Sequence, residues 1–228
     1  MNKNLTAVPD LGTKLALTGL VKNTFMLTQG ALILAMLVTV VGVFRTKEKK
    51  MRLAFALESA IAAISSYFYS IFTNRIINKD QVSPIEIAEN RYLDWCITRP
   101  IMIFVLILVL GIDISKIAQL VTIVLVIILD FAMLHFGYLG ETGVMKKPVA
   151  CLWGFIPFFI MFALIYRTFL VPNQSIKKNF LFGAFMVIWS LYGLVFLLDE
   201  TNKNIAMNLL DALAKGGVGI GLYTHFLG

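Results

Sequence analysis

Seven long apolar stretches with few charged residues constrain this chain more than any other feature of its sequence. They cover residues 23–44, 53–73, 91–111, 116–139, 148–171, 179–198 and 204–227. Each is close in length to the roughly 20 helical residues that cross the hydrocarbon core of a bilayer. Backbone groups in lipid must be hydrogen-bonded internally, and the stretches lack the period-two alternation of a barrel strand. The sequence therefore predicts an all-α membrane protein, a bundle of seven transmembrane helices, with no room for a soluble enzyme module.

The positive charges of the chain lie at the ends of these stretches. The net charge is +7, but the basic residues form no single patch, which disfavours nucleic acid and leaves the lipid bilayer as the expected partner. By the positive-inside rule, the links richest in Lys and Arg face the cytoplasm. This places the N-terminus outside and the C-terminus in the cytoplasm. The links in question are those between the first and second stretches (Arg45, Lys47, Lys49, Lys50, Arg52) and between the fifth and sixth (Arg167, Lys177, Lys178).

The remaining segments suggest one membrane domain. Residues 1–22 lack the apolar core and small-residue cleavage site of a signal peptide, so we expect an extracellular segment there and a membrane domain over residues 23–228. The two histidines of the chain stand apart from clustered Cys, Asp or Glu, so no metal site is predicted.

Ionisable residues inside the apolar stretches are candidates for function. Charged groups in a membrane are costly and usually face the bundle interior or a water-filled cavity. The competing interpretation is that they form structural ion pairs. The candidates are Glu58, Arg91, Asp94, Arg99, Asp130, Asp211 and Lys215.

The last two candidates form a pair. Asp211 and Lys215 are four residues apart, which places them one helical turn from each other. Lys215 is too far from either end of its stretch to reach water. Two chemical solutions remain for such a lysine: loss of its proton, or condensation with a carbonyl compound to give a Schiff base. A protonated Schiff base needs a nearby carboxylate, and Asp211 is placed to supply it.

The third stretch supplies a second half for such a site. Its helical spacing aligns a carboxylate with a hydroxyl one turn inward and an arginine one turn outward, a line along which a proton can move. The stripe consists of Arg91, Asp94, Thr98, Met102 and Val105, with Trp95 and Arg99 beside it.

Three separated motifs resemble those of the type I (microbial) rhodopsins. They are RYLDW at residues 91–95 followed by Thr98 and Pro100, WSLYG at residues 189–193, and LDALAKGG at residues 210–217. The resemblance extends over the second to seventh stretches in matching order and spacing.

The resemblance implies a light-absorbing cofactor and roles for individual residues. It implies all-trans retinal bound to Lys215 as a Schiff base, with Asp94 as primary counterion and proton acceptor. It also implies Asp211 as second counterion and Arg91 as a gate toward the outer side. The remaining residues that it implies enclose the polyene (Trp95, Trp189, Tyr192), lie beside the ring (Trp153, Met133, Gly137) or tune the colour toward green (Met102).

The sequence departs from outward proton pumps of this family at the cytoplasmic proton donor. The third helix of those pumps carries a carboxylate where this chain has Val105. Glu58, in the cytoplasmic half of the second stretch, is the one evident replacement. The alternative is that Glu58 is a structural glutamate without a part in proton transfer.

A second departure is Arg99, which stands where the family usually has a small hydroxyl residue or a cysteine. Its expected partner on the fourth helix is Asp130, and a buried arginine beside a carboxylate predicts a bidentate ion pair. Two interpretations are open: a structural pin between two helices, or an element that alters the photocycle or the passage of cations.

Outward proton translocation from the Schiff base to Asp94 is the function that these residues favour. The alternatives are a light-gated ion channel, favoured by the missing donor, and a photosensor with a slow photocycle and no net transport. Residue sets of sodium and chloride pumps are absent from the sequence, as are hydrolase, kinase and redox motifs, so an enzyme is not predicted. Homo-oligomers are expected, because such bundles bury further surface against copies of themselves.

Overall fold

The computed structural model describes residues 19–78 and 82–227, and within them seven helices are long and apolar enough to cross a membrane. Five are α1 (Gly19–Arg45), α2 (Lys49–Ile77), α3 (Pro84–Leu110), α4 (Ile117–Glu141) and α6 (Ile176–Val195). The fifth in chain order begins with α5 (Lys147–Ile165) and continues through a π-helical segment (Tyr166–Leu170) and a 3-10 turn (Val171–Asn173). The seventh runs from α7 (Glu200–Asp211) through a π-helical segment into α8 (Val218–Leu227). The prediction of an all-α seven-helix bundle is confirmed.

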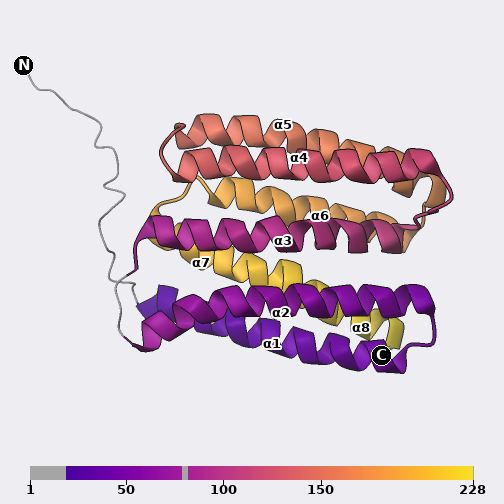
Figure 1. Cartoon of the computed structure of the whole chain (residues 1–228), viewed down its shortest axis with the longest axis horizontal. Helices are drawn as coiled ribbons and strands as arrows, with labels where there is room; N and C mark the ends of the chain where they lie inside the picture. Colours follow the sequence, from indigo (N-terminus) through magenta and orange to yellow (C-terminus); the bar gives the residue numbers. More distant parts are fainter. Residues whose placement is uncertain (1–18, 79–81, 228) are drawn as a thin grey trace, which may run out of the picture.

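The helices lie roughly parallel to one long axis, and their links gather at the two ends (Figure 1). We call the end at which α1 begins the N-terminal end of the bundle, and the end at which α8 finishes the C-terminal end. Most of the predicted outer segment, residues 1–22, lies outside the described residues. Its last four residues belong to α1, which begins at Gly19.

Most helices extend beyond the apolar stretches that predicted them, because charged residues at a helix end can stay in the polar interface. The start of α3 shows this best. Pro84 occupies the first turn, and Ser83 and Glu86 form a reciprocal capping box in which Glu86 N donates to Ser83 Oγ (3.2 Å) and Ser83 N to Glu86 Oε2 (2.9 Å). The apolar pattern alone placed this start at residue 91.

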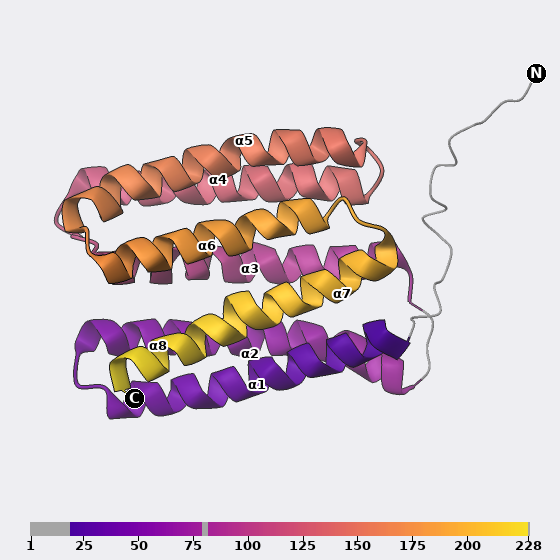
Figure 2. The same cartoon turned by 180° about the vertical axis from the view of Figure 1, so that it is seen from behind.

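The third and seventh spans occupy the centre of the bundle. In the most apolar part of α3, 61% of the residues are buried, against 22% in α4 and 17% in α6, whose outer faces are left for lipid. Figure 2 shows α7 and α8 crossing obliquely between the pair α1 and α2 on one side and α3 and α6 on the other. Side chains from α3 and α7 therefore meet in the interior.

An ion-pair network joins the ends of three helices at the N-terminal end. Lys203 Nζ on α7 lies 2.6 Å from Glu141 Oε2 on α4 and 2.8 Å from Glu200 Oε1. Lys147 Nζ on α5 lies 3.0 Å from the same Glu200 oxygen. The side chains of Lys203 and Glu141 are each only 5% exposed, so these charges depend on one another rather than on water.

Candidate functional site

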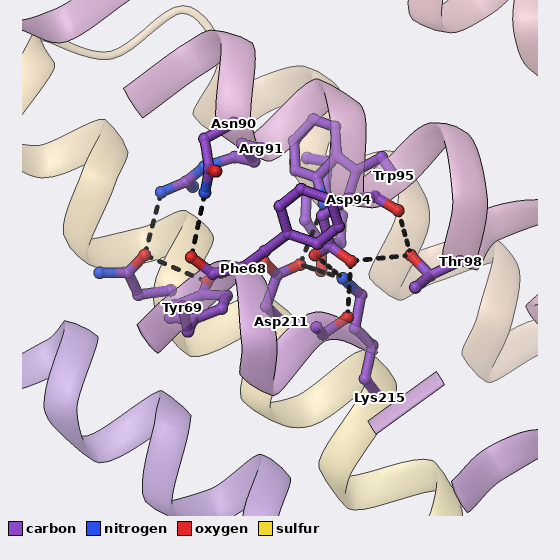
Figure 3. Close-up of polar contacts among 12 residues, drawn as sticks. Phe68, Tyr69, Asn90, Arg91, Asp94, Trp95, Thr98, Asp211 and Lys215 are labelled. Atoms are coloured by element: carbon purple, nitrogen blue, oxygen red, sulfur yellow. Dashed lines mark hydrogen bonds and ion pairs between the residues drawn. The ribbon is translucent and has the colours of Figure 1, made fainter. Parts of the chain in front are cut away.

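A buried lysine between two carboxylates forms the centre of the bundle (Figure 3). Lys215 Nζ lies 2.5 Å from Asp94 Oδ2 on α3 and 3.8 Å from Asp211 Oδ1 on its own span. All three side chains are at most 2% exposed. One basic and two acidic side chains are thus buried together, so the lysine can offset the charge of only one carboxylate.

The backbone around Lys215 is not a regular α-helix. Residues Ala212–Gly217 form a π-helical segment between α7 and α8. Short π-helical segments within α-helices are rare and occur frequently at functional sites. The sequence predicted one continuous helical face for Asp211 and Lys215, and it carried no sign of this widened turn.

Neutral donors hold both carboxylates in place. Asp94 Oδ1 accepts from Ser65 Oγ (2.8 Å). Thr98 Oγ1 lies 3.3 Å from the same oxygen, but its shorter hydrogen bond, of 2.8 Å, goes to the backbone carbonyl of Asp94. Asp211 accepts from the hydroxyls of Tyr69 and Tyr192 (both 2.7 Å) and from Trp95 Nε1 (3.3 Å).

Ser65 and Tyr69 on α2 were not among the predicted site residues. They follow Glu58 by seven and eleven residues, a spacing that places all three on one helix face. This spacing was the signal in the sequence from which Ser65 and Tyr69 could have been predicted.

Arg91 lies on α3 one turn from Asp94 toward the N-terminal end. Its Nη2 donates to Asn204 Oδ1 (3.2 Å) and Asn208 Oδ1 (3.0 Å) on α7, while Nη1 is buried and has no hydrogen-bond partner among the described residues. A cavity of about 10 Å³ borders Arg91, Asp94 and Tyr69, near the lower limit of space for one water molecule. The guanidinium therefore bonds to amides rather than to the two aspartates.

An aromatic cavity of about 70 Å³ adjoins the charged centre. Trp95 and Tyr192 connect the cavity with the charged centre, because each donates a hydrogen bond to Asp211 and also lines the cavity. Trp189, Met133 and Gly137 line it as well. Residues of the lining that the sequence analysis did not single out are Tyr92, Leu134, Ala150, Cys151, Gly154, Phe155, Phe158, Gly193, Phe196 and Met207.

Two glycines make room for aromatic side chains at this cavity. A Cβ atom on Gly193 of α6 would lie 2.6 Å from the Phe155 ring, and one on Gly137 of α4 would collide with the hydroxyl of Tyr92. Phe155 and Tyr92 can therefore approach these helices closely only because both positions are glycine.

Two residues predicted to contact the cofactor do not line the cavity. Met102 is 3% exposed within the core but is not among the lining side chains. Trp153 is 49% exposed and stacks on Phe136 with 5.9 Å between ring centroids, so its place beside the retinal ring stays a prediction. It points outward because Gly154, its neighbour in the chain, occupies the inward face of α5.

Arg99 and Asp130 form the predicted interhelical pair, but with a different geometry. Arg99 Nε and Nη2 both lie 2.9 Å from Asp130 Oδ1, so a single oxygen receives both donors. Asp130 Oδ2 is buried, and the described part of the chain offers it no hydrogen-bond partner. The Arg99 guanidinium also lies over the Trp189 ring, 4.1 Å from its centroid, and borders the aromatic cavity.

Glu58 lies apart from the central cluster but faces it. It is 3% exposed, and the described residues give its carboxyl group no hydrogen bond or ion pair. On α2 it precedes Ser65 by seven residues, a rise of about 10 Å toward the C-terminal end. A Cβ atom on Gly219, one turn beyond Lys215 on the seventh span, would lie 3.5 Å from Glu58 Oε2. Val105, where a donor was expected by resemblance, is buried at 1% exposure.

Asp199 directly precedes α7 at the N-terminal end of the bundle. It caps α7, where its Oδ1 accepts from the backbone of Thr201 and Asn202 (both 3.1 Å). These hydrogen bonds, chiefly those of Asn202, hold the pKa of the Asp199 carboxyl below its ordinary value. Asp199 is therefore a poor proton acceptor.

Comparisons with known proteins agree with this architecture. The chain matches the family model described as bacteriorhodopsin-like protein over residues 20–226. Among solved structures it is similar to the viral rhodopsin OLPVRII, with 29% identity and a TM-score of 0.82 over 91% of this chain and 97% of that one. Comparison with curated proteins gives no significant match.

Two more distant structures share the fold. Xanthorhodopsin, described as a light-driven ion pump with dual chromophore, is 20% identical, with a TM-score of 0.74 over 93% of this chain and 95% of that one. The proton-pumping rhodopsin AR2 from the marine alga Acetabularia acetabulum is 21% identical, with a TM-score of 0.70 over 92% and 96% of the two chains.

Proposed function

The chain belongs to the bacteriorhodopsin-like family of microbial rhodopsins, and from this premise we propose that it is a light-activated retinal protein that translocates protons outward. The observation that carries the proposal is the contact of 2.5 Å between Lys215 Nζ and Asp94 Oδ2 in the interior of a membrane protein. A nitrogen and a carboxylate at this distance can exchange a proton directly.

The residues around Lys215 fit retinal. The lysine is a buried primary amine, the chemical group that condenses with an aldehyde. Asp94, the nearer of the two carboxylates beside it, balances the positive charge of the product in a region of low dielectric constant. The adjoining cavity is lined by Trp95, Trp189 and Tyr192, flat apolar surfaces suited to a conjugated chain. Retinal bound to Lys215 Nζ as a Schiff base supplies the absorption of light and the change of shape that follows it.

The protein residues then determine where the proton goes. Asp94 Oδ2 accepts the proton from the Lys215 nitrogen, and the Ser65 hydroxyl orients the carboxylate through its other oxygen, with Thr98 in weaker contact. Asp211 stays as a fixed negative charge, because three donors from Tyr69, Tyr192 and Trp95 already occupy its oxygens. The two carboxylates thus divide the roles of acceptor and counterion.

Arg91 extends the route toward the N-terminal end. Its guanidinium borders the small cavity next to Asp94, and its hydrogen bonds to Asn204 and Asn208 leave it free of a carboxylate partner. A positive group in this place favours departure of the proton from Asp94 toward the outer side and opposes its return.

Glu58 is the proposed donor that returns a proton to the Lys215 nitrogen. It lies on the C-terminal side of the central cluster, next to Gly219, and no basic partner among the described residues holds its carboxyl group ionised. Because residue 219 has no side chain, the carboxyl group of Glu58 can lie against the seventh span one turn beyond Lys215, where the side chain of Thr39 on α1 lies close as well. Val105 leaves α3 without a group for this task.

The charge of the links supports the proposed direction. The links between α1 and α2 and between α5 and α6 lie at the C-terminal end of the bundle (Figure 1). They carry most of the basic residues near helix ends, so this end is assigned to the cytoplasm. Asp94 and Arg91 then lie on the outer side of Lys215, and Glu58 lies on the inner side.

Photocurrent under voltage clamp tests the proposal. Cells expressing the protein with added retinal are illuminated while external pH and cation composition are varied, with Lys215→Ala as the control without chromophore. Outward current at zero voltage and without an ion gradient is expected. Current whose sign follows the ion gradient would instead establish a light-gated channel. Absence of current from protein that has reached the surface and bound retinal would overturn transport, and a long-lived intermediate after a flash would then indicate a photosensor.

A further inference from the structure

Arg99 brings a positive charge to the wall of the aromatic cavity. Its side chain comes from α3, five residues beyond Asp94, and its guanidinium carbon lies 4.1 Å from the centroid of the Trp189 ring. Trp189 is itself part of the cavity lining. The charge is therefore held against the same aromatic surface that the conjugated chain would contact.

The carboxylate partner of Arg99 lies behind it. Asp130 is fully buried and is not among the residues that line the cavity, whereas Arg99 is. Both contacts of the pair use Asp130 Oδ1, on the side facing α3. The ion pair is thus a dipole whose positive end is directed at the cavity and whose negative end is directed away from it.

We propose that the Arg99–Asp130 pair is a colour-tuning element that shifts the absorption of the bound chromophore to shorter wavelength. The inference rests on the proposed retinal function. Light excitation of a conjugated cation held at Lys215 moves positive charge from the nitrogen into the chain that occupies the cavity. A fixed positive charge there repels the displaced charge and raises the energy of the excited state more than that of the ground state.

The counter-charge determines the size of the effect. Asp130 opposes Arg99, but it is farther from the cavity, so the nearer positive charge dominates in a region of low dielectric constant. A structural pin between α3 and α4 would make a different prediction, because loss of either partner would then lower stability without moving the absorption band in a defined direction.

Absorption maxima of retinal-reconstituted variants test this inference. Arg99→Gln removes the positive charge and is expected to shift the maximum to longer wavelength, by on the order of 10 nm or more. Arg99→Lys keeps the charge and is expected to remain closer to the wild type. Asp130→Asn leaves Arg99 without its counter-charge and is expected to shift the maximum the opposite way, to shorter wavelength.

Two further variants keep the test decisive. Asp130→Asn leaves a buried arginine unpaired and can prevent folding, so Arg99→Gln/Asp130→Asn is measured as well. It removes both charges together, and because the nearer positive charge dominates, its maximum is expected at longer wavelength than that of the wild type, by less than for Arg99→Gln. Arg75→Gln is the matched control, because Arg75 pairs with Glu86 at the N-terminal end of the bundle with 38% and 43% of the side chains exposed. Its maximum is expected to stay unchanged.

The outcomes separate this inference from the function on which it rests. A wild-type visible band with no shift in Arg99→Gln or the double variant would overturn the tuning role alone. A shift to shorter wavelength in these variants would overturn it too, as would an Arg99→Lys shift equal to that of Arg99→Gln. A wild-type protein that forms no visible band with retinal would overturn the proposed function and the tuning role together.

Discussion

The two carboxylates beside Lys215 are chemically unequal. Asp94 lies 2.5 Å from the lysine nitrogen and Asp211 lies 3.8 Å away. Asp211 accepts hydrogen bonds from three aromatic side chains, whereas the donors to Asp94 are two small hydroxyls. In the sequence, Asp211 is the nearer neighbour of Lys215, so only the packing of α3 against the seventh span makes Asp94 the closer partner.

Asp94→Asn is expected to shift the absorption maximum of the retinal-bound protein to longer wavelength. The carboxylate stabilises the positive charge at the Lys215 nitrogen in the ground state, and its loss narrows the gap to the excited state. Deprotonation of that nitrogen after a flash should also be lost. Absorption and flash spectroscopy measure both effects, and an unchanged spectrum with unchanged deprotonation would remove Asp94 from its proposed role.

Glu58→Gln is expected to slow the return of a proton to the Lys215 nitrogen by tenfold or more, which corresponds to about 1.4 kcal/mol or more in the barrier. Flash photolysis follows the recovery, and azide, a small weak acid, should restore the rate. Glu89→Gln is the control, because Glu89 is an exposed glutamate near the other end of the bundle. Equal recovery rates in wild type and Glu58→Gln would leave Glu58 a structural residue.

At the scale of helices, buried charge pairs join elements that the sequence does not show to be neighbours. Lys203 links the start of α7 to the end of α4 through Glu141, 62 residues away along the chain. Sequence patterns gave no reason to pair these two residues, since each lies near the end of its own apolar stretch. The contact exists because the short links at this end bring the ends of α4, α5 and α7 together.

Lys203→Met is expected to lower the free energy of unfolding by about 3 kcal/mol, because it leaves Glu141 as a buried charge that lacks its main partner. The loss should lie at the low end of the range for broken buried pairs, since Lys147 Nζ remains 3.8 Å from Glu141. Unfolding of the purified protein in detergent measures it. Lys116→Met, at a pair with side chains 64% and 44% exposed, is the control and should change stability by less than about 1 kcal/mol. Equal stability of the two variants would contradict a structural role for the network.

Helix boundaries show what local patterns capture and where they fail. The apolar stretches located every membrane span, since lipid imposes length and hydropathy on each helix separately. They missed the first two turns of α3, where Glu86 and Glu89 interrupt the hydropathy although Ser83 and Glu86 cap the helix. They also extended the sixth span to residue 198, whereas α6 ends at Val195.

At the scale of the whole molecule, charge at the links predicts the orientation in the membrane. The C-terminal end of the bundle carries the basic links and is expected in the cytoplasm. An epitope attached after residue 228 should therefore be reached by antibody only after cells are permeabilised, with an epitope before residue 1 as the opposite control. Labelling of the C-terminal epitope on intact cells would contradict the orientation and reverse the proposed direction of transport.

Association with further copies of the chain stays a prediction. Many large apolar side chains on α1, α4, α5 and α6 are exposed, which suits contact with lipid and contact with another bundle equally well. Cross-linking in native membranes distinguishes these cases.

The sequence by itself determined the seven helices, the family resemblance and the presence of a lysine with two aspartates in the membrane. Each of these depends on composition or on spacing within one segment. Tertiary structure decided which carboxylate lies closest to Lys215, that Ser65 and Tyr69 of α2 join the site, and that Trp153 faces outward. It also decided that Arg99 is directed at the aromatic cavity with Asp130 behind it. These facts depend on how helices rotate and tilt against one another, and that arrangement follows from packing over the whole bundle rather than from the pattern of any one helix.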